Sequence, residues 1–96
     1  MTTMETFDSI FDALADTPEQ AANLTARADL LIAIRERVRE WGLPQEQAAT
    51  RLGLTRPRLN DLLRGKLEKF SLDALVNIAT AAGYKVHIEI GESEAA

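Results

Sequence analysis

A single, mainly α-helical domain is the fold class that this 96-residue sequence predicts. Over most of the chain, apolar residues recur at the three- and four-residue spacing of amphipathic helices. Residues 45–65 contain two short helical stretches joined at a glycine, and only residues 84–90 alternate apolar and polar side chains as a β-strand does. We therefore predict an N-terminal amphipathic helix in residues 1–16, a helical bundle over 17–83, and a C-terminal strand with a short tail over 84–96.

The N-terminal helix is predicted from an apolar stripe at helical spacing, formed by Phe7, Ile10, Phe11 and Leu14. Another face carries Asp8, Asp12 and Asp16. Two interpretations stay open: the stripe covers the chain's own helices, or the helix docks a basic partner protein. The residues assigned to this docking are Phe7, Asp8, Phe11 and Asp12. Evenly spaced acids on a helix usually form a solvated face, so no metal site is predicted there.

A longer helix follows, because Thr17, Pro18 and Gln20 form an N-terminal capping pattern. Threonine is a favoured N-cap, proline is tolerated at the first helical position, and a glutamine three residues after the threonine completes a capping box. Apolar residues at core spacing carry this helix towards Trp41, and Gly42 is its predicted end.

Residues 45–65 predict two short helices that meet at a tight turn, which is the layout of a helix-turn-helix. Ala48 and Ala49 are small enough for the two helices to cross closely. Gly53 stands at the corner, where a positive φ costs glycine least. Thr55 is the predicted N-cap of the second helix and Gly65 its predicted stop.

The second of these helices has a basic, amide-bearing outer face. Its outward residues are Arg56, Pro57, Arg58, Asn60, Asp61 and Arg64. Guanidinium and amide groups on an exposed first turn of helix are suited to hydrogen-bond base edges and phosphates in a DNA major groove. The alternative is an ordinary helical hairpin whose arginines face water, but the alanines, the corner glycine and the threonine cap occur together and favour DNA binding.

The chain after this motif predicts a loop over residues 66–70, a last helix and a strand. Ser71 is the predicted cap of the helix, with Asp73 in its first turn, and Gly83 ends it. In the strand, the apolar face is formed by Tyr84, Val86, Ile88 and Ile90. An isolated strand has no ladder, so we predict that these four residues form a homodimer interface by antiparallel pairing with a second copy. An edge strand resting on the helices and a strand offered to another protein are the alternatives.

Charge is segregated along the chain, although its net value is −4. Residues 1–34 carry one base and six acids, residues 35–69 carry nine bases and five acids, and residues 70–96 carry one base and four acids. The positive third coincides with the predicted helix-turn-helix. Such a pattern is expected when one face meets DNA and another meets a basic partner.

Composition argues against several other classes of protein. The chain has no cysteine, which excludes disulfides and thiolate metal sites, and a single histidine, His87, on the polar face of the predicted strand. It contains no nucleophile elbow and no glycine-rich phosphate loop, so neither an enzymatic role nor a cofactor is predicted. No apolar run reaches membrane-spanning length, and the acidic N-terminus is unlike a secretory signal, so a cytoplasmic protein without membrane association is expected.

The segment over residues 28–83 resembles the XRE (Cro/repressor-like) helix-turn-helix family. Gln45, Ala49, Gly53 and Thr55 match the spacing of that family's pattern, and Gly65 matches its closing glycine. The resemblance implies a lambda-repressor-like helical bundle that binds double-stranded operator DNA, typically an inverted repeat, as a dimer. The whole chain is similar to a compact subgroup of antitoxins, which implies autoregulation and a toxin partner that is basic. A free-standing, phage-like regulator and an interaction module without DNA affinity remain the alternatives.

The resemblance also assigns roles on the DNA face. Arg56 and Pro57 open the recognition helix, and Arg56 is the first candidate for a bidentate contact with guanine. Asn60, Arg58 and Asp61 are further candidates for base contact, while Pro57 is restricted to packing against a thymine methyl. The residues assigned to the DNA backbone are Gln45, Thr55, Arg64 and Lys66.

Overall fold

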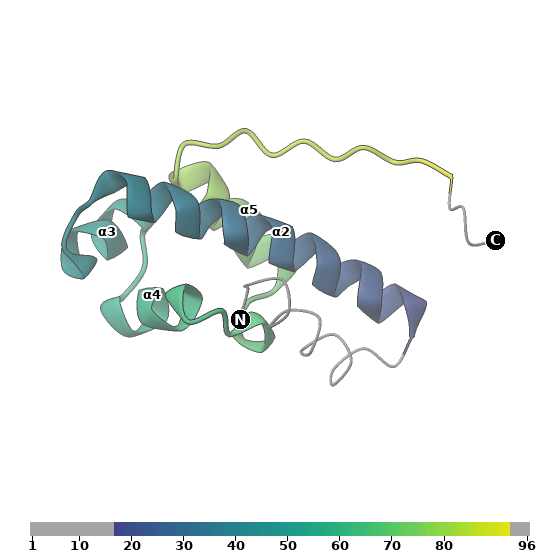
Figure 1. The fold of residues 1–96 in the computed structure, drawn as a ribbon, viewed down its shortest axis with the longest axis horizontal. Coiled ribbons are helices and arrows are strands. Elements are labelled where there is room, and N and C mark those ends of the chain that lie inside the picture. Colours follow the sequence, from purple (N-terminus) through teal and green to yellow (C-terminus); the bar gives the residue numbers. More distant parts are fainter. Residues whose placement is uncertain (1–16, 93–96) are drawn as a thin grey trace.

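The computed structural model describes residues 17–92, and this part of the chain forms four α-helices and one turn of 3₁₀ helix. In chain order they are α2 (Pro18–Trp41), α3 (Gln45–Leu52), α4 (Arg56–Leu63), η1 (Leu67–Lys69) and α5 (Leu72–Ala81). Figure 1 shows that the long α2 lies across the shorter helices, with α3 and α4 gathered near its C-terminal half. The prediction of a mainly α-helical domain is confirmed for the described residues.

Helix α2 begins and ends where its capping residues predict. Thr17 Oγ1 accepts a hydrogen bond from the backbone N–H of Gln20 at 3.1 Å, and Pro18 occupies the first turn. At the other end, Gly42 has a φ of +61° and its N–H donates to the carbonyl of Arg39. One side of the helix is buried, through Leu24, Ala28, Leu31, Ile34 and Val38. This stripe is the surface on which the other elements pack.

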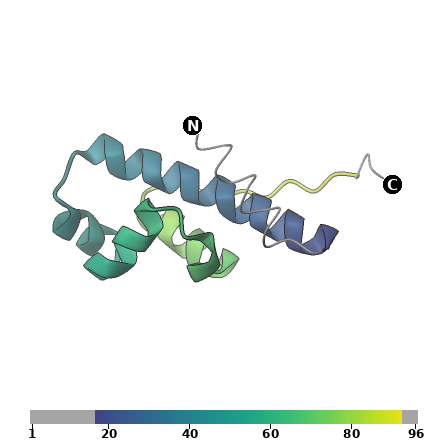
Figure 2. The ribbon, with the colours of Figure 1, turned by 60° about the horizontal axis from the view of Figure 1, so that its bottom comes forward.

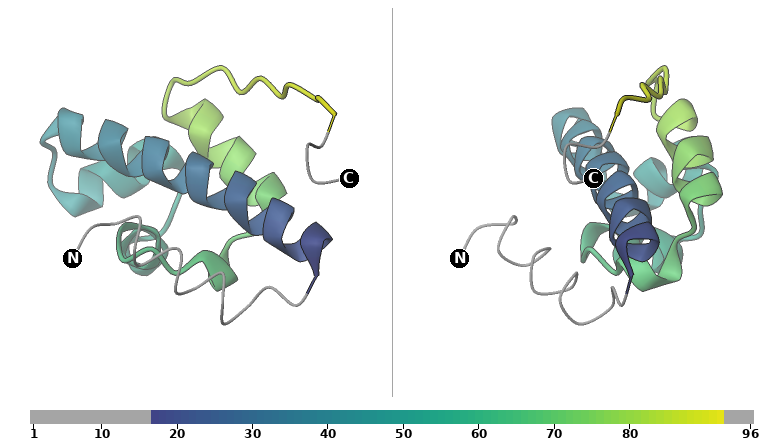
Figure 3. Two further views of the ribbon diagram at one scale, coloured as in Figure 1. Left: turned by 45° about the vertical axis from the view of Figure 1, so that its right-hand side comes forward. Right: turned by 90° about the vertical axis from the view of Figure 1, so that its right-hand side faces the viewer.

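The core is built from apolar side chains that every helix contributes. The largest fully buried ones are Phe70, Leu31, Ile34, Leu59, Leu62, Leu67 and Leu75. Helix α5 lies beside α2, as both views of Figure 3 show. Within residues 17–92 no polar or charged side chain is buried. The stability of the domain therefore depends on apolar burial and on close packing.

Helices α3 and α4 form the predicted helix-turn-helix. Ala48 and Ala49 are 1% and 3% exposed at the crossing, so their small size is what permits the close approach. Gly53 turns the chain with a φ of +70°, and the N–H of Leu54 donates to the carbonyl of Ala49 at 2.8 Å. Thr55 Oγ1 then accepts from the N–H of Arg58 at 3.3 Å. Each of these features was expected from the residue at its position.

The chain after α4 stays close to this helix. Figure 2 shows α3, α4 and η1 on the same side of α2. The predicted loop over residues 66–70 contains the single turn η1, whose Leu67 is buried, and Phe70 immediately after it is 1% exposed. Ser71 Oγ caps α5 by accepting from the N–H of Ala74 at 3.1 Å, as predicted. These short connections fix the basic loop beside α4.

The predicted β-strand over residues 84–90 is wrong for the single chain, because no strand is present in the described residues. The segment is extended and runs back over the helices as the yellow-green trace of Figure 1. A β-ladder needs a second strand alongside, and residues 17–92 supply none. Tyr84 and Val86 pack partly against the core, whereas Ile88 and Ile90 are 70% and 94% exposed. The alternation of apolar and polar residues over 84–90 therefore forms no β-ladder within the described residues.

The predicted N-terminal helix, with Phe7, Asp8, Phe11 and Asp12, lies outside the described residues. Between residues 17 and 92, no helix is long and apolar enough to cross a membrane. In the same range no group of three or more histidine and carboxylate side chains is placed to hold a metal ion.

Candidate nucleic-acid interface

The first turn of α4 is the most open part of the predicted DNA face. Thr55, Arg56 and Pro57 are exposed, and so is Arg64 at the other end of the helix. Because the side chain of Thr55 caps the helix and Leu59 and Leu62 anchor its inner side at 0% exposure, the outer turn is held rigidly while remaining accessible. A rigid, exposed N-terminal turn is the geometry by which a recognition helix enters a major groove.

Arg56 is available for contact with DNA. Within residues 17–92 its guanidinium takes part in no hydrogen bond, ion pair or ring contact. It occupies the first position of α4, next to the N-cap, where a long side chain reaches outward from the helix end. An unrestrained guanidinium here can donate two hydrogen bonds to O6 and N7 of guanine.

Arg58 is placed differently from Arg56, although both were predicted on the outer face. Its guanidinium carbon lies 4.1 Å from the ring centroid of Phe70, and Nη1 donates to the carbonyl of Lys69 at 2.7 Å. Both contacts direct the side chain towards the loop that follows η1. Arg58 therefore joins α4 to this loop. One of its hydrogen-bond donors, Nη1, is already engaged in the chain without DNA.

The Arg58→Ala variant is expected to lower the free energy of unfolding by about 1–2 kcal/mol, because it removes a cation–π contact and a charge-assisted hydrogen bond. Its preference among DNA sequences is expected to stay unchanged. Chemical denaturation together with a binding-site selection measures both properties. A relaxed preference at one base pair with unchanged stability would contradict this placement and assign Arg58 to base contact.

Asp61, Lys66 and Lys69 form an ionic cluster beside α4. The Asp61 carboxylate lies 3.4 Å from Lys66 Nζ and 3.5 Å from Lys69 Nζ. Partial removal from water opposes ionisation of Asp61, but hydrogen bonds and charges from the two lysines outweigh it, so its pKa lies below the ordinary value of 3.8. Lys69 was not among the predicted contacts. Only the folded loop, which brings it to Asp61, identifies it as part of this surface.

Replacing Asp61 with asparagine is expected to lower stability at neutral pH but not in acid. Since the pKa of the folded state is lowered, the ionised carboxylate stabilises the fold above about pH 4, and this contribution is lost as the pH falls through the folded-state pKa. Denaturant midpoints of wild type and Asp61→Asn at about pH 7 and about pH 2.5 measure the difference. A gap that persists undiminished in acid would contradict the ionic role. Glu68→Gln is the control, because this exposed carboxylate of the same loop forms no ion pair in the described chain.

The N-terminus of α3 provides a second basic surface. Gln45 is exposed there, and its N-cap Pro44 makes no side-chain capping hydrogen bond, so N–H groups of the first turn remain open. A groove of about 440 Å³ adjoins it and is lined by Gln45, Arg35 and Arg39 among others. Open helix N–H groups beside guanidiniums suit a phosphate. Arg35 and Arg39 were not among the residues predicted for this surface, although the arginines alternate along the chain near the end of α2.

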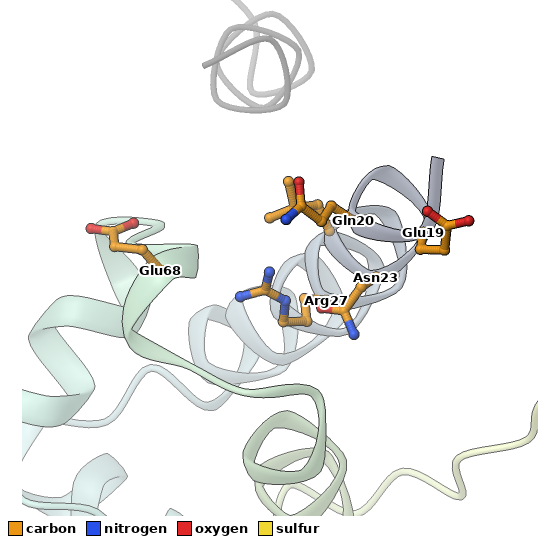
Figure 4. Close-up of a pocket in the computed structure, with 6 residues that line it drawn as sticks. Glu19, Gln20, Asn23, Arg27 and Glu68 are labelled. Carbon is orange, nitrogen blue, oxygen red and sulfur yellow. The ribbon is translucent and has the colours of Figure 1, made fainter. Parts of the chain in front are cut away.

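A second hollow, of about 520 Å³, lies at the opposite end of the domain and has a different character. Figure 4 shows Gln20, Asn23 and Arg27 on α2, with Glu19 near the start of that helix and Glu68 on the separate element at the other side of the hollow. Arg27 Nη1 donates to the carbonyls of Leu67 and Phe70 at 2.9 and 3.1 Å, which ties η1 to α2. Carboxylates on both sides disfavour an anionic ligand, so this hollow is not part of the DNA face.

Comparison with known families agrees with this geometry. A family model described as a helix-turn-helix domain matches residues 13–91, which include every helix of the described chain and most of the C-terminal segment. The match is consistent with the predicted XRE resemblance. No curated protein matches the sequence. The chain belongs to the helix-turn-helix domain family, and this membership places it among the DNA-binding regulators.

Proposed function

We propose that the chain is a sequence-specific transcriptional repressor that binds an operator in its own upstream region. The observation that carries this proposal is the unrestrained guanidinium of Arg56 on the exposed first turn of α4. Further basic groups lie on neighbouring elements: Arg35 and Arg39 line a groove with Gln45 of α3, and Lys66 and Lys69 lie beside Asp61 of α4. In this arrangement Arg56 reads a base, while these basic groups, together with Gln45, Thr55 and Arg64, hold the DNA backbone.

The functional form in this proposal is a homodimer. One eight-residue recognition helix reads only a short half-site, whereas two helices related by a two-fold axis read an inverted repeat. The proposed interface consists of Tyr84, Val86, Ile88 and Ile90. Ile88 and Ile90 are 70% and 94% exposed and alternate with polar residues in the extended segment, so with Val86 they offer a contiguous apolar face that a second copy can cover.

An electrophoretic shift of the purified chain tests DNA recognition. Its own upstream DNA and a scrambled control are compared at two salt concentrations. Tight binding to the upstream DNA alone, falling steeply as salt rises, is the expected result because phosphate contacts release counterions. Equal and weak binding to both DNAs would overturn the repressor role and favour a module that binds only proteins.

We also propose that the repressor is the antitoxin of a toxin–antitoxin operon. The support is the overall resemblance to antitoxins and the acidic character of residues 1–34, which carry six acids and one base and suit a basic partner. Co-expression with a small basic protein encoded next to this chain tests the proposal. If the chain neutralises that protein but loses this activity when residues 1–16 are deleted, the result would assign docking of the toxin to Phe7, Asp8, Phe11 and Asp12. Absence of such a neighbouring gene would leave a free-standing regulator.

A further inference from the structure

The C-terminal segment is anchored firmly at its start. Tyr84 Oη donates to the carbonyl of Ala33 at 3.0 Å, and the N–H of Tyr84 donates to the carbonyl of Ala79 at 3.0 Å. The guanidinium carbon of Arg37 lies 4.1 Å from the centroid of the Tyr84 ring, while Nη1 of Arg37 donates to the carbonyl of Ala82 at 3.1 Å. These contacts fix where the segment leaves the helical domain and in which direction.

Beyond Tyr84 the segment offers an open edge. Within the described chain, residues 85–92 take part in no hydrogen bond or ion pair. Val86 and Ile88 line an apolar groove of about 330 Å³ together with Leu30 of α2 and Val76 of α5. The segment thus combines unpaired backbone groups, which can form a ladder, with an apolar face over an unfilled groove.

The charges of the segment are self-complementary. In the sequence, Lys85 stands two residues before His87 and Glu89 two residues after it, and both are exposed. In an antiparallel pair, directly opposite residues share a face, and opposite charges placed there stabilise the pairing. A second copy of the same residues, running in the opposite direction about His87, matches both charges at once. This symmetry indicates that the partner of the segment is a second copy of the chain.

We propose that two copies pair in one register, with the two-fold axis passing through His87. Lys85 of each copy then faces Glu89 of the second copy, Val86 faces Ile88, and Tyr84 faces Ile90. The apolar face of the resulting two-stranded ribbon covers the groove between α2 and α5. This inference rests on the proposed homodimer and adds its register and its charge pairs.

The two neighbouring registers pair fewer of the charged and apolar side chains. With the axis at Val86, Lys85 faces His87 and Glu89 faces Gly83, so neither charge is paired with an opposite charge. Ile90 would then fall opposite Ala82, which is buried at the end of α5 and not part of the extended segment. With the axis at Ile88, His87 faces Glu89, but Lys85 faces Gly91 and Tyr84 faces Glu92. Only the axis at His87 pairs both charges and keeps all four apolar residues opposite one another.

The test is the dimer dissociation constant of the full chain, measured by sedimentation equilibrium, for wild type and three variants. Lys85→Glu and Glu89→Lys each place like charges opposite one another twice per dimer, so each is expected to raise the constant roughly tenfold or more. The double variant restores opposite charges and is expected to return close to the wild-type constant. Glu92→Lys is the matched control, because it makes the same charge change outside the paired residues.

Each outcome separates the register from the homodimer itself. Restoration in the double variant supports the register. A wild-type dimer that neither single variant weakens, or a double variant as weak as the singles, overturns the register while the homodimer stands. Weakening by Glu89→Lys alone places the axis at Ile88 and also overturns it. A wild-type chain that stays monomeric at every concentration overturns the proposed homodimer, and the register with it.

Discussion

The Phe70→Ala variant is expected to lose about 3–5 kcal/mol of unfolding free energy. The Phe70 side chain is 1% exposed and lies in the core cluster, so truncation leaves a cavity and forfeits the burial of an aromatic ring. The ring also forms a cation–π contact with Arg58, whose guanidinium carbon lies 4.1 Å from the ring centroid. Since small domains are stable by only about 5–15 kcal/mol, this variant is expected to unfold at a much lower denaturant concentration.

Phe70→Leu is the matched control for this prediction. It keeps most of the apolar volume but removes the ring beneath Arg58, so a loss of about 1 kcal/mol is expected. Denaturant unfolding followed by helical circular dichroism measures both variants. Losses of equal size in the alanine and leucine variants would contradict the assignment, because the effect would then come from the contact with Arg58 and not from the core.

Replacing Arg56 with alanine is expected to reduce affinity for the operator by about 1–3 kcal/mol and to relax the base preference at one position of the half-site. The fold should be unaffected, because Arg56 is exposed and takes part in no hydrogen bond, ion pair or ring contact in the described chain. Competition among operator variants that each carry one changed base pair measures the preference.

Arg64→Ala serves as the comparison for Arg56→Ala. Arg64 is exposed at the opposite end of α4 and is assigned to a phosphate, so its replacement should weaken binding to all sequences alike and reduce the salt dependence. Uniform weakening by Arg56→Ala, with no base pair singled out, would assign Arg56 to the DNA backbone as well.

The helical framework was predictable because its signals are local. Thr17, Thr55 and Ser71 each accept the capping hydrogen bond expected of them, at 3.1, 3.3 and 3.1 Å. Gly42 and Gly53 adopt the positive φ angles that end or turn helices. Such features depend on a few neighbouring residues, so the sequence alone is sufficient to place them.

The surface chemistry was less predictable because it depends on contacts between distant residues. Arg58 was predicted to face outward, yet it lies on Phe70, twelve residues later. The ion pairs of Asp61 with Lys66 and Lys69 depend on how the backbone of η1 folds back beside α4. The spacing of apolar residues in the sequence does not predict this. The hydrogen bonds from Arg27 to Leu67 and Phe70 join residues about forty positions apart. The prediction of a strand over residues 84–90 was wrong for a related reason, because a ladder needs a second strand and residues 17–92 supply none.

A footprint of the wild-type chain on the DNA upstream of its own gene tests the central claim most directly. If the two α4 helices of a dimer enter the DNA major groove, two protected half-sites are expected about one helical turn, or roughly 34 Å, apart. Their protection should disappear as the salt concentration is raised. The absence of protected half-sites, or equal protection along upstream and scrambled DNA, would contradict sequence-specific recognition by α4.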